Sequence, residues 1–226
     1  MTATTKKCLK LHKLFVAELA RSSQLETEGS RVLSSLANVS QRIPILLKDD
    51  DNSKVMGVLQ FSCSSQALLL QKHFLALETS YGFLTTILRD YQEMLRHLRS
   101  FTNECVTLVD QHITNDGDST EDESAAMTFS MKLQEWMETV LTMFEHEVLR
   151  KSSLVANLEY SDLNRLTTAS KQWKANGRMG NIDYDYVQTG LPMPKNLDSR
   201  AINSDNNEIV TKKRKKKKKK AIKGQN

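Results

Sequence analysis

Histidines are the first candidates for catalysis or metal binding, because imidazole serves both roles near neutral pH. The chain has five, and they lie far apart in the sequence: His12, His73, His97, His112 and His146. The best local combination is Glu145-His146-Glu147, but adjacent helical residues point in different directions. The sequence has no Gly-rich phosphate loop, GxSxG turn or CxxC pair. We therefore predict that the protein is not an enzyme and binds no metal or cofactor.

The chain also has three cysteines: Cys8, Cys63 and Cys105. Their odd number and wide spacing do not suit a disulfide framework, which favours a reducing compartment inside the cell. Near the N-terminus, Lys10, Lys13 and Glu18 interrupt every apolar run, and no other window is long enough for a membrane span. The sequence predicts neither a signal peptide nor a membrane helix.

The densest charge is a run of nine basic residues near the C-terminus. It comprises Lys212, Lys213, Arg214, Lys215, Lys216, Lys217, Lys218, Lys219 and Lys220. Together with Lys223 it takes ten of the 32 Lys and Arg residues, which leaves 22 against 27 acids, so the body carries −5 although the whole chain is +5. The run predicts a nuclear or nucleolar address. The alternative is sequence-blind contact with RNA or another phosphate, since no aromatic residue lies within the run to stack on bases.

Helices must carry these side chains, because 226 residues with only 8 Gly and 3 Pro favour helix over tight turns. One segment keeps a strict 4,3 spacing through about six heptads, which is typical of a coiled-coil seam. Its positions are Leu70, Phe74, Leu77, Tyr81, Leu84, Leu88, Tyr91, Leu95, Leu98, Thr102, Cys105, Val109 and His112. At ~1.5 Å per residue this helix is roughly 60 Å long. We expect it to pack along other helices in a bundle.

A weaker seam precedes this segment, if Gly29 is counted as a gap. It comprises Leu25, Val32, Leu36, Val39 and Ile43, with Phe15, Leu11 and Cys8 in register further back. Pro44 predicts the end of this first helix. Residues 114–124 are acidic and lack large apolar side chains, which predicts a solvated linker.

A third long helix is predicted after the linker, with Lys151 in the register of its stripe. Its apolar positions are Phe129, Leu133, Trp136, Val140, Phe144, Val148, Val155 and Leu158. Ser161 is expected to cap a short fourth helix, with Asp162 near its positive end. Leu163, Leu166 and Trp173 give this helix its apolar side, and Asn176 and Gly177 are expected to end it.

The sequence thus predicts an all-α, elongated bundle of three long helices plus a short fourth over residues 1–176. A disordered tail is predicted for residues 177–226, with the lysine-rich run at 212–223. Inside the tail, alternating apolar residues predict an extended island for a partner's groove or sheet edge. They are Ile182, Tyr184, Tyr186, Val187, Leu191 and Met193. Unequal helices leave part of the long seam uncovered, and we expect that part at Thr102 to His112.

Residues 149–173, LRKSSLVANLEYSDLNRLTTASKQW, resemble the C-terminal helical region of the AIRIM family, the AAA-ATPase-interacting ribosome maturation factors. The matching positions are Leu149, Arg150, Lys151, Leu154, Asp162, Leu163, Leu166, Lys171 and Trp173. The upstream EWMETV, with Trp136, also fits, and residues 32–43 and 77–98 are similar to the first and central helices of that family. The chain departs from the family pattern at Ala169 and Ser170, where a Leu-Pro pair is expected, and in its long lysine tail.

The resemblance implies a non-catalytic adaptor that works with an AAA ATPase and a second small helical subunit. Such a complex releases or recycles assembly factors from pre-60S ribosomal particles, in the nucleus, nucleolus and cytoplasm. It also implies that the matching residues bind the partner: Leu149, Arg150, Lys151, Leu154, Asp162, Leu163, Leu166 and Trp173. Two alternatives stay open. One is a coiled-coil scaffold or tether that pairs with itself through Leu70 to Val109, and the other is an RNA-binding protein that uses its tail.

Overall fold

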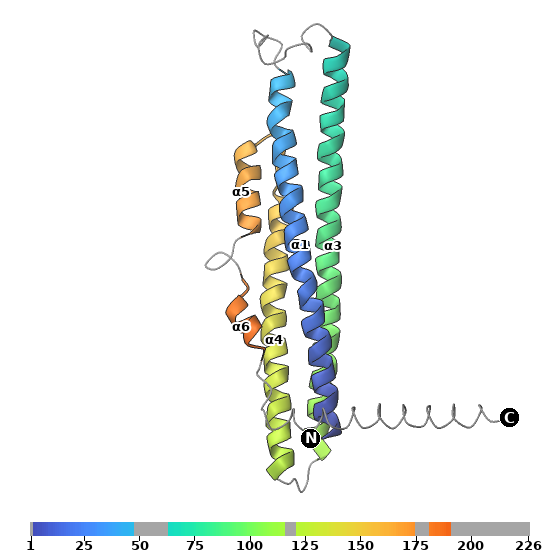
Figure 1. The fold of residues 1–226 in the computed structure, drawn as a ribbon, viewed down its shortest axis with the longest axis vertical. Helices are drawn as coiled ribbons and strands as arrows, with labels where there is room; N and C mark the ends of the chain where they lie inside the picture. The colour runs from blue at the N-terminus through green and yellow to red at the C-terminus, as the bar shows by residue number, and fades with distance from the viewer. Residues whose placement is uncertain (1, 48–62, 116–120, 175–180, 191–226) are drawn as a thin grey trace, which may run out of the picture.

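The chain folds into a long helical bundle whose three main helices lie side by side (Figure 1). The computed structural model describes residues 2–47, 63–115, 121–174 and 181–190. The bundle consists of α1 (Ala3–Leu47), α3 (Cys63–Asn115) and α4 (Glu121–Ala156). α1 and α4 point the same way, and α3 runs against both. Over the described ranges the protein is all-α without a strand, which confirms the predicted fold class.

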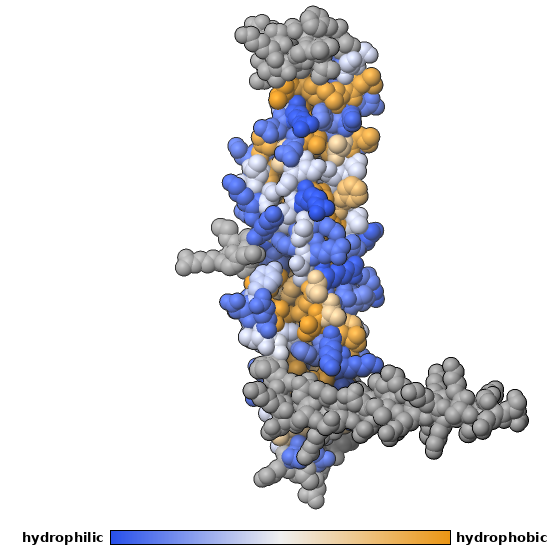
Figure 2. Space-filling view, viewed as in Figure 1, coloured by the Kyte–Doolittle hydropathy of each residue, from blue (hydrophilic) through white to orange (hydrophobic). Residues whose placement is uncertain are grey.

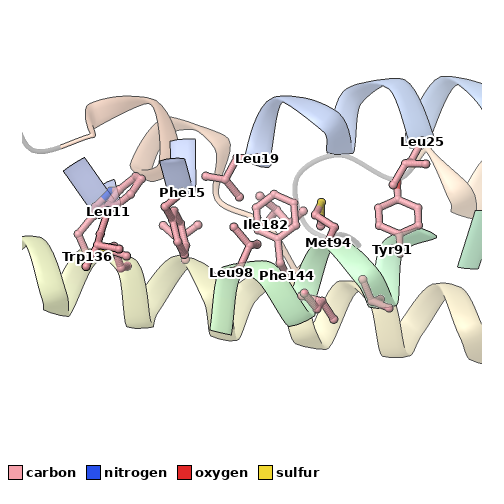
Figure 3. Packing of buried hydrophobic residues seen from close by; sticks show 14 of the residues in the cluster. Leu11, Phe15, Leu19, Leu25, Tyr91, Met94, Leu98, Trp136, Phe144 and Ile182 are labelled. Carbon is pink, nitrogen blue, oxygen red and sulfur yellow. The ribbon is translucent and has the colours of Figure 1, made fainter. Parts of the chain in front are cut away.

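The core lies where the three helices meet, as Figure 3 shows. From Leu84 to Val109, the seam positions of α3 are buried except for the partly buried Leu88. Phe15 on α1 and Trp136 on α4 pack edge-on, with ring centroids 5.7 Å apart. Fully burying one large apolar side chain contributes about 1.5–3 kcal/mol, so these repeated contacts hold the helices together.

A short helix, α5 (Leu163–Trp173), packs mainly against α1 and also touches α4. It begins where it does because the Asp162 carboxylate accepts a hydrogen bond from the backbone N–H of Arg165 at 3.1 Å. The prediction of Ser161 as the cap is therefore wrong by one residue. At its other end, Trp173 is fully buried and its Nε1 donates to the carbonyl oxygen of Glu26 at 3.1 Å. Both ends of α5 are thus fixed.

A second short helix, α6 (Tyr184–Thr189), replaces the extended island that the alternating pattern predicted. Asp183 caps it by accepting from the Tyr186 backbone N–H at 3.0 Å. Ile182 joins the core, and Trp136 Nε1 on α4 donates to the carbonyl oxygen of Tyr186 at 3.3 Å. The cap and the bundle surface select a helix here, so the island is wrong and the predicted bundle boundary at residue 176 comes too early. Leu191 and Met193 lie outside the described residues.

Two long helices extend beyond their predicted ends. α1 passes Pro44 and ends at Leu47. A proline in the last turn removes one backbone hydrogen bond, but the continued turn buries Leu46, whose carbonyl oxygen accepts from Gln66 Nε2 at 2.7 Å. α3 reaches Asn115 and α4 begins at Glu121, which corrects the predicted linker 114–124 at both ends. Residues 116–120 lie outside the described part.

The bundle is uneven because α1 and α3 have 45 and 53 residues and α4 has 36. Their joined end extends past α4 (Figure 1). The prediction of a free seam at Thr102 to His112 is wrong: Thr102, Cys105 and Val109 are buried, since α4 begins beside that end of α3. The uncovered part lies at the opposite end, where Phe74 and Tyr81 are exposed.

The two glycines inside long helices form a matched pair for testing how α5 docks. A Cβ on Gly29 would lie 2.2 Å from Cζ2 of Trp173, whereas a Cβ on Gly82 would meet nothing within 4 Å. Gly29→Ala should therefore displace Trp173 and lower the free energy of unfolding by about 1–3 kcal/mol. Gly82→Ala should raise it by roughly 0.5–1 kcal/mol, because alanine favours the helix. Urea titration followed by circular dichroism measures both, and equal effects of the two changes would contradict this account.

Candidate functional site

A buried lysine lies at the junction of α1, α4 and α5. Lys151 on α4 is 1% exposed. Its Nζ lies 2.6 Å from Glu26 Oε2 on α1 and 3.1 Å from Glu147 Oε1 one turn earlier on α4, and it donates to the carbonyl oxygen of Trp173 at 2.8 Å. A buried ammonium is stable only when charges and acceptors surround it, and here two carboxylates and a carbonyl do so.

Two aromatic rings complete the surroundings of Lys151. The Nζ atom lies 4.4 Å from the ring centroid of Trp173 and 6.0 Å from that of Tyr91 on α3, within the range of cation–π attraction. The Tyr91 hydroxyl donates to Glu26 Oε2 at 3.3 Å. Burial, and next the Glu26 carboxylate, raise the pKa of Tyr91, so its phenol keeps the proton that it donates. Side chains from α1, α3, α4 and α5 thus meet at one charge.

The more buried carboxylate of this cluster, that of Glu147, has several other partners. Arg150 Nε donates to Glu147 Oε2 at 2.9 Å, and Arg150 Nη1 donates to the carbonyl oxygen of Gln172 at 2.7 Å. The Asn181 backbone N–H donates to Glu147 Oε2 at 3.3 Å. Burial raises the pKa of Glu147, but the bond from Arg150 and the charge of Lys151 outweigh it, so the pKa lies below its ordinary value. The cluster thus joins segments that lie far apart in the sequence.

The residues that the resemblance marks for partner binding are therefore spread between the interior and the surface. Lys151, Leu166 and Trp173 are buried in the bundle. Asp162 caps α5, and Arg150, Leu154 and Leu163 are partly buried. Leu149 is 69% exposed and is the most accessible of the set. Binding of a partner by these residues stays a prediction, and the structure adds an internal packing role for the buried members.

The sequence pointed to some residues of this cluster but not to their contacts. Lys151 was placed in register with the apolar stripe of its helix, and Gly29 was counted as a gap in its seam. Nothing in the sequence paired Lys151 with Glu26, because the two lie 125 positions apart and on different helices. Only the docking of α4 against α1 brings them together.

The histidines show no shared site in the described part of the chain. No group of three His, Cys, Asp or Glu side chains there is arranged to hold a metal ion. His12 packs against Trp136 with ring centroids 5.0 Å apart, and burial lowers its pKa. Glu145 pairs with Arg99 on α3 at 2.6 Å, while Glu147 belongs to the lysine cluster. The neighbours of His146 thus point to different surroundings, as expected for adjacent helical residues.

Cys8 on α1 and Cys105 on α3 are free thiols in the core. A hydrogen bond between their side chains lowers the pKa of Cys8 and raises the pKa of Cys105. Both thiols are fully buried, so neither is placed as a surface nucleophile. Among the described helices, none is long and apolar enough to span a bilayer. The lysine run 212–220 and the rest of the segment 191–226 lie outside the described residues.

The exposed apolar surface gathers on residues 64–88 of α3, which we name the apolar arm. Its Leu68, Leu75 and Phe83 are 64%, 62% and 57% exposed, and Phe74 and Tyr81 are exposed as well. Over this length only Lys72 and Glu78 carry a fixed charge. Figure 2 shows hydrophobic residues at the same end of the molecule. Large exposed apolar patches mark interaction sites, so the arm is the best candidate for binding a protein.

The next part of α3 provides a contrast within one helix. Its outward side carries Arg89, Asp90, Glu93, Arg96, Arg99 and Glu104. Glu93 and Arg96 pair at 2.6 Å, and His97 lies between Glu93 and Glu18 of α1. These charges suit permanent exposure to water. The change from an uncharged to a charged outer side near residue 89 sets the limit of the apolar arm.

Removing the buried ammonium tests the lysine cluster. Lys151→Met keeps a long side chain but leaves Glu147 and Glu26 without their common partner, and we expect a loss of about 3–5 kcal/mol in the free energy of unfolding. Lys171→Met, at an exposed position of α5, is the control and should change it by less than about 0.5 kcal/mol. Thermal and urea unfolding measure both variants. A Lys151→Met protein as stable as wild type would show that the cluster is not needed for folding.

A protein-family comparison places these helices among known proteins. The family described as ribosome biogenesis protein C1orf109-like matches residues 2–189. The match begins just before α1 and ends with the last residue of α6, so it includes every described helix. Comparison with curated proteins and with solved structures gives no match. Since the match spans most of the chain, the protein belongs to the C1orf109-like family of ribosome biogenesis proteins, the AIRIM family that residues 149–173 resemble.

Proposed function

We propose that this ribosome biogenesis protein is a non-catalytic adaptor that connects an AAA ATPase and a second small helical subunit to pre-60S particles. In this proposal the ATPase supplies all the nucleotide chemistry, and the complex releases or recycles assembly factors. The family supports a part in ribosome maturation. The proposal of an ATPase partner and of the pre-60S particle rests on the implied role of the AIRIM family, together with the surface of the bundle.

The main observation that supports an adaptor role is the apolar arm. A helix that is hydrophobic on several sides is normally buried on several sides. In the arm, Leu77 and Leu84 face α1 and are buried, whereas Leu75 and Phe83 on other sides of the same turns are exposed. Within the described residues, no helix of the chain covers these side chains. A second protein that packs there would bury them, which is what an adaptor requires.

The interior supports the same proposal. The buried charged side chains of the described part, Lys151 and Glu147, pair with each other, and they also pair with the partly buried Glu26 and Arg150. Such an arrangement fixes helices in place and gives the molecule a rigid rod about 80 Å long, from the 53 residues of α3 at ~1.5 Å each. A rigid rod that binds one protein at its apolar arm keeps that protein at a fixed distance from a second molecule bound elsewhere on the rod.

The self-pairing scaffold is the weaker alternative. It requires the seam from Leu70 to Val109 to be free for a second copy, but α1 and α4 already cover this seam from Leu84 onward. In the remaining part of the seam Leu77 is also buried, and only Phe74 and Tyr81 are exposed. Tyr81 packs edge-on against Tyr160 with ring centroids 5.8 Å apart. A homodimer through the full seam would have to open the bundle.

For the lysine run we propose an address that brings the protein to the nucleus and nucleolus, with a second population in the cytoplasm. Ten basic residues within 212–223 attract phosphate without regard to sequence, so non-specific contact with ribosomal RNA is compatible with this role. The acidic body, at −5, does not share that attraction. The tail and the arm would thus serve different partners.

Affinity purification of the full chain tests the adaptor proposal. Wild type should recover an AAA ATPase together with pre-60S factors. Leu75→Glu with Phe83→Glu should lose these proteins, because two charges on the arm oppose its burial, without a change in melting temperature. Leu149→Glu is the control at an equally exposed leucine outside the arm. Loss on Leu149→Glu alone would favour the residues marked by the resemblance, and wild type that recovers neither ATPase nor pre-60S factors would contradict the proposal.

Deleting residues 212–223 tests the address. We expect a fluorescently tagged chain to lose nuclear and nucleolar accumulation, because the cluster that an import receptor would bind is gone. The folded body should still recover its partners from a lysate. As a control, an unrelated nuclear signal fused to the deleted chain should restore accumulation. Unchanged localisation after the deletion would show that the lysine run is not the address.

A further inference from the structure

The apolar arm carries a second seam on the side of α3 that faces away from the bundle. Six exposed positions follow one another at steps of four and three residues, which places them on one side of the helix. They are Leu68, Lys72, Leu75, Thr79, Gly82 and Thr86. The buried seam of Leu77 and Leu84 lies on the other side. We name this exposed row the outer seam.

We propose that a helix of a different protein packs along the outer seam, with its apolar side on Leu75 and Gly82 and an acidic residue opposite Lys72. This names a binding surface for the adaptor and rests on the proposed function. It differs from the inner seam, by which we mean the 4,3 row of α3 that is buried from Leu84 onward. Phe74 and Tyr81 continue that row into the apolar arm. The outer seam does not depend on α4 at all.

The threonine hydroxyls of the outer seam already form hydrogen bonds within α3. The Thr79 hydroxyl donates to the carbonyl oxygen of Leu75 at 2.7 Å, and the Thr86 hydroxyl donates to that of Gly82 at 3.0 Å. The neighbouring Thr85 donates to Tyr81 in the same way, at 3.1 Å. Because these hydroxyls are satisfied within α3, a partner can cover them without leaving a polar group unpaired. Apart from Lys72, a partner can therefore cover the seam without desolvating an unpaired polar side chain.

Gly82 gives the outer seam its shape. Glycine weakens a helix interior, and no side chain in the described part of the chain fills the space that Gly82 leaves, since a Cβ there would meet nothing within 4 Å. At Gly29, by contrast, the missing Cβ makes room for Trp173. The open notch at Gly82, with Leu75 one heptad before it and Phe83 beside it, admits the close approach of another backbone.

The charges on the seam restrict how a partner can pack. A second copy in parallel would place Lys72 against Lys72. An antiparallel copy that seats Leu75 on Gly82 would bring the two Glu78 residues to one edge of the contact. These two arrangements gather like charges at an otherwise uncharged surface and are disfavoured. A different helix with a carboxylate opposite Lys72 avoids both and fixes its own register. An antiparallel copy that seats Leu68 on Gly82 would instead bring Lys72 close to Glu78 of the other copy. The choice of a different protein over a second copy therefore follows from the proposed adaptor function, and the crosslinked product distinguishes the two.

The length of the contact follows from the sequence beyond Thr86. The same spacing continues with Arg89, Glu93 and Arg96, which are exposed and charged. Glu93 and Arg96 already pair with each other. The apolar row therefore stops near residue 88, and the bound helix should cover about 20 residues of α3, or roughly 30 Å.

Site-directed photo-crosslinking in cells tests the proposal with the full chain. A photoreactive amino acid at Thr86 should crosslink to a helix of another protein, with an acidic residue about four turns from the crosslink, opposite Lys72. The control places it at Glu104, exposed on the same side of α3 five turns further on, and should give no such product. Crosslinks to a second copy of this chain, equal products from both positions, or no product from Thr86 would overturn the proposal.

A matched pair of lysine substitutions adds a quantitative arm. Gly82→Lys fills the notch and adds a charge, and should lower the Thr86 crosslink about tenfold or more, equivalent to about 1.4 kcal/mol of binding. Ser100→Lys makes the same addition on the same side of α3, 18 residues on, and should leave the crosslink unchanged. Both proteins should melt at or above the wild-type temperature. A Gly82→Lys protein that crosslinks like wild type would overturn the proposal.

The outcomes separate this site from the adaptor function. If wild type recovers the ATPase and pre-60S factors but Thr86 crosslinks nothing, the outer seam is wrong and the adaptor proposal stands. If Thr86 crosslinks a helix of a protein outside ribosome maturation and Gly82→Lys removes it, the seam stands and the adaptor proposal fails.

Discussion

The indole of Trp173 packs against Gly29, and the arrangement of the helices depends on this contact. A side chain on residue 29 would occupy the same space as the indole, so α5 can approach α1 only because a glycine lies there. The Trp173 carbonyl oxygen then accepts from Lys151, and its ring covers the ammonium. A steric vacancy on α1 therefore decides where α5 ends and which groups surround the buried charge of α4.

That junction also explains why a charge can lie in an apolar core. The desolvation cost of Lys151 is offset by Glu147 on the same helix, by Glu26 and by the Trp173 carbonyl dipole, and the last two come from segments that must be docked to contribute. The cluster therefore distinguishes the docked arrangement from any other packing of the same leucine-rich helices. Apolar seams alone would tolerate sliding by a heptad, whereas a single charge with fixed partners does not.

The uneven lengths of the helices have a functional consequence. The middle and lower parts of α3 are enclosed by α1 and α4, and their outward side is charged. The arm has lost α4 as a neighbour but carries more exposed apolar side chains than the rest of α3. A chain that needed only to fold would place charges where water reaches the helix. The reversed pattern suits a protein that binds other proteins, as we propose for this member of a ribosome biogenesis family.

The sequence by itself determined the helices and their inner sides, because apolar residues that repeat with the 3.6-residue period of a helix lie on the side that becomes buried. The seam from Leu84 to Val109 and the stripe containing Trp136 and Lys151 were predictable for this reason. Local chemistry was less decisive: Pro44 did not end α1, and the alternating residues near Tyr184 formed a helix once Asp183 capped it against the bundle. Only the tertiary structure decided that Glu26 meets Lys151, that Gly29 receives Trp173, and that the free end of α3 is at Leu68 to Phe83. These depend on how far each helix extends beside its neighbours, which periodicity does not specify.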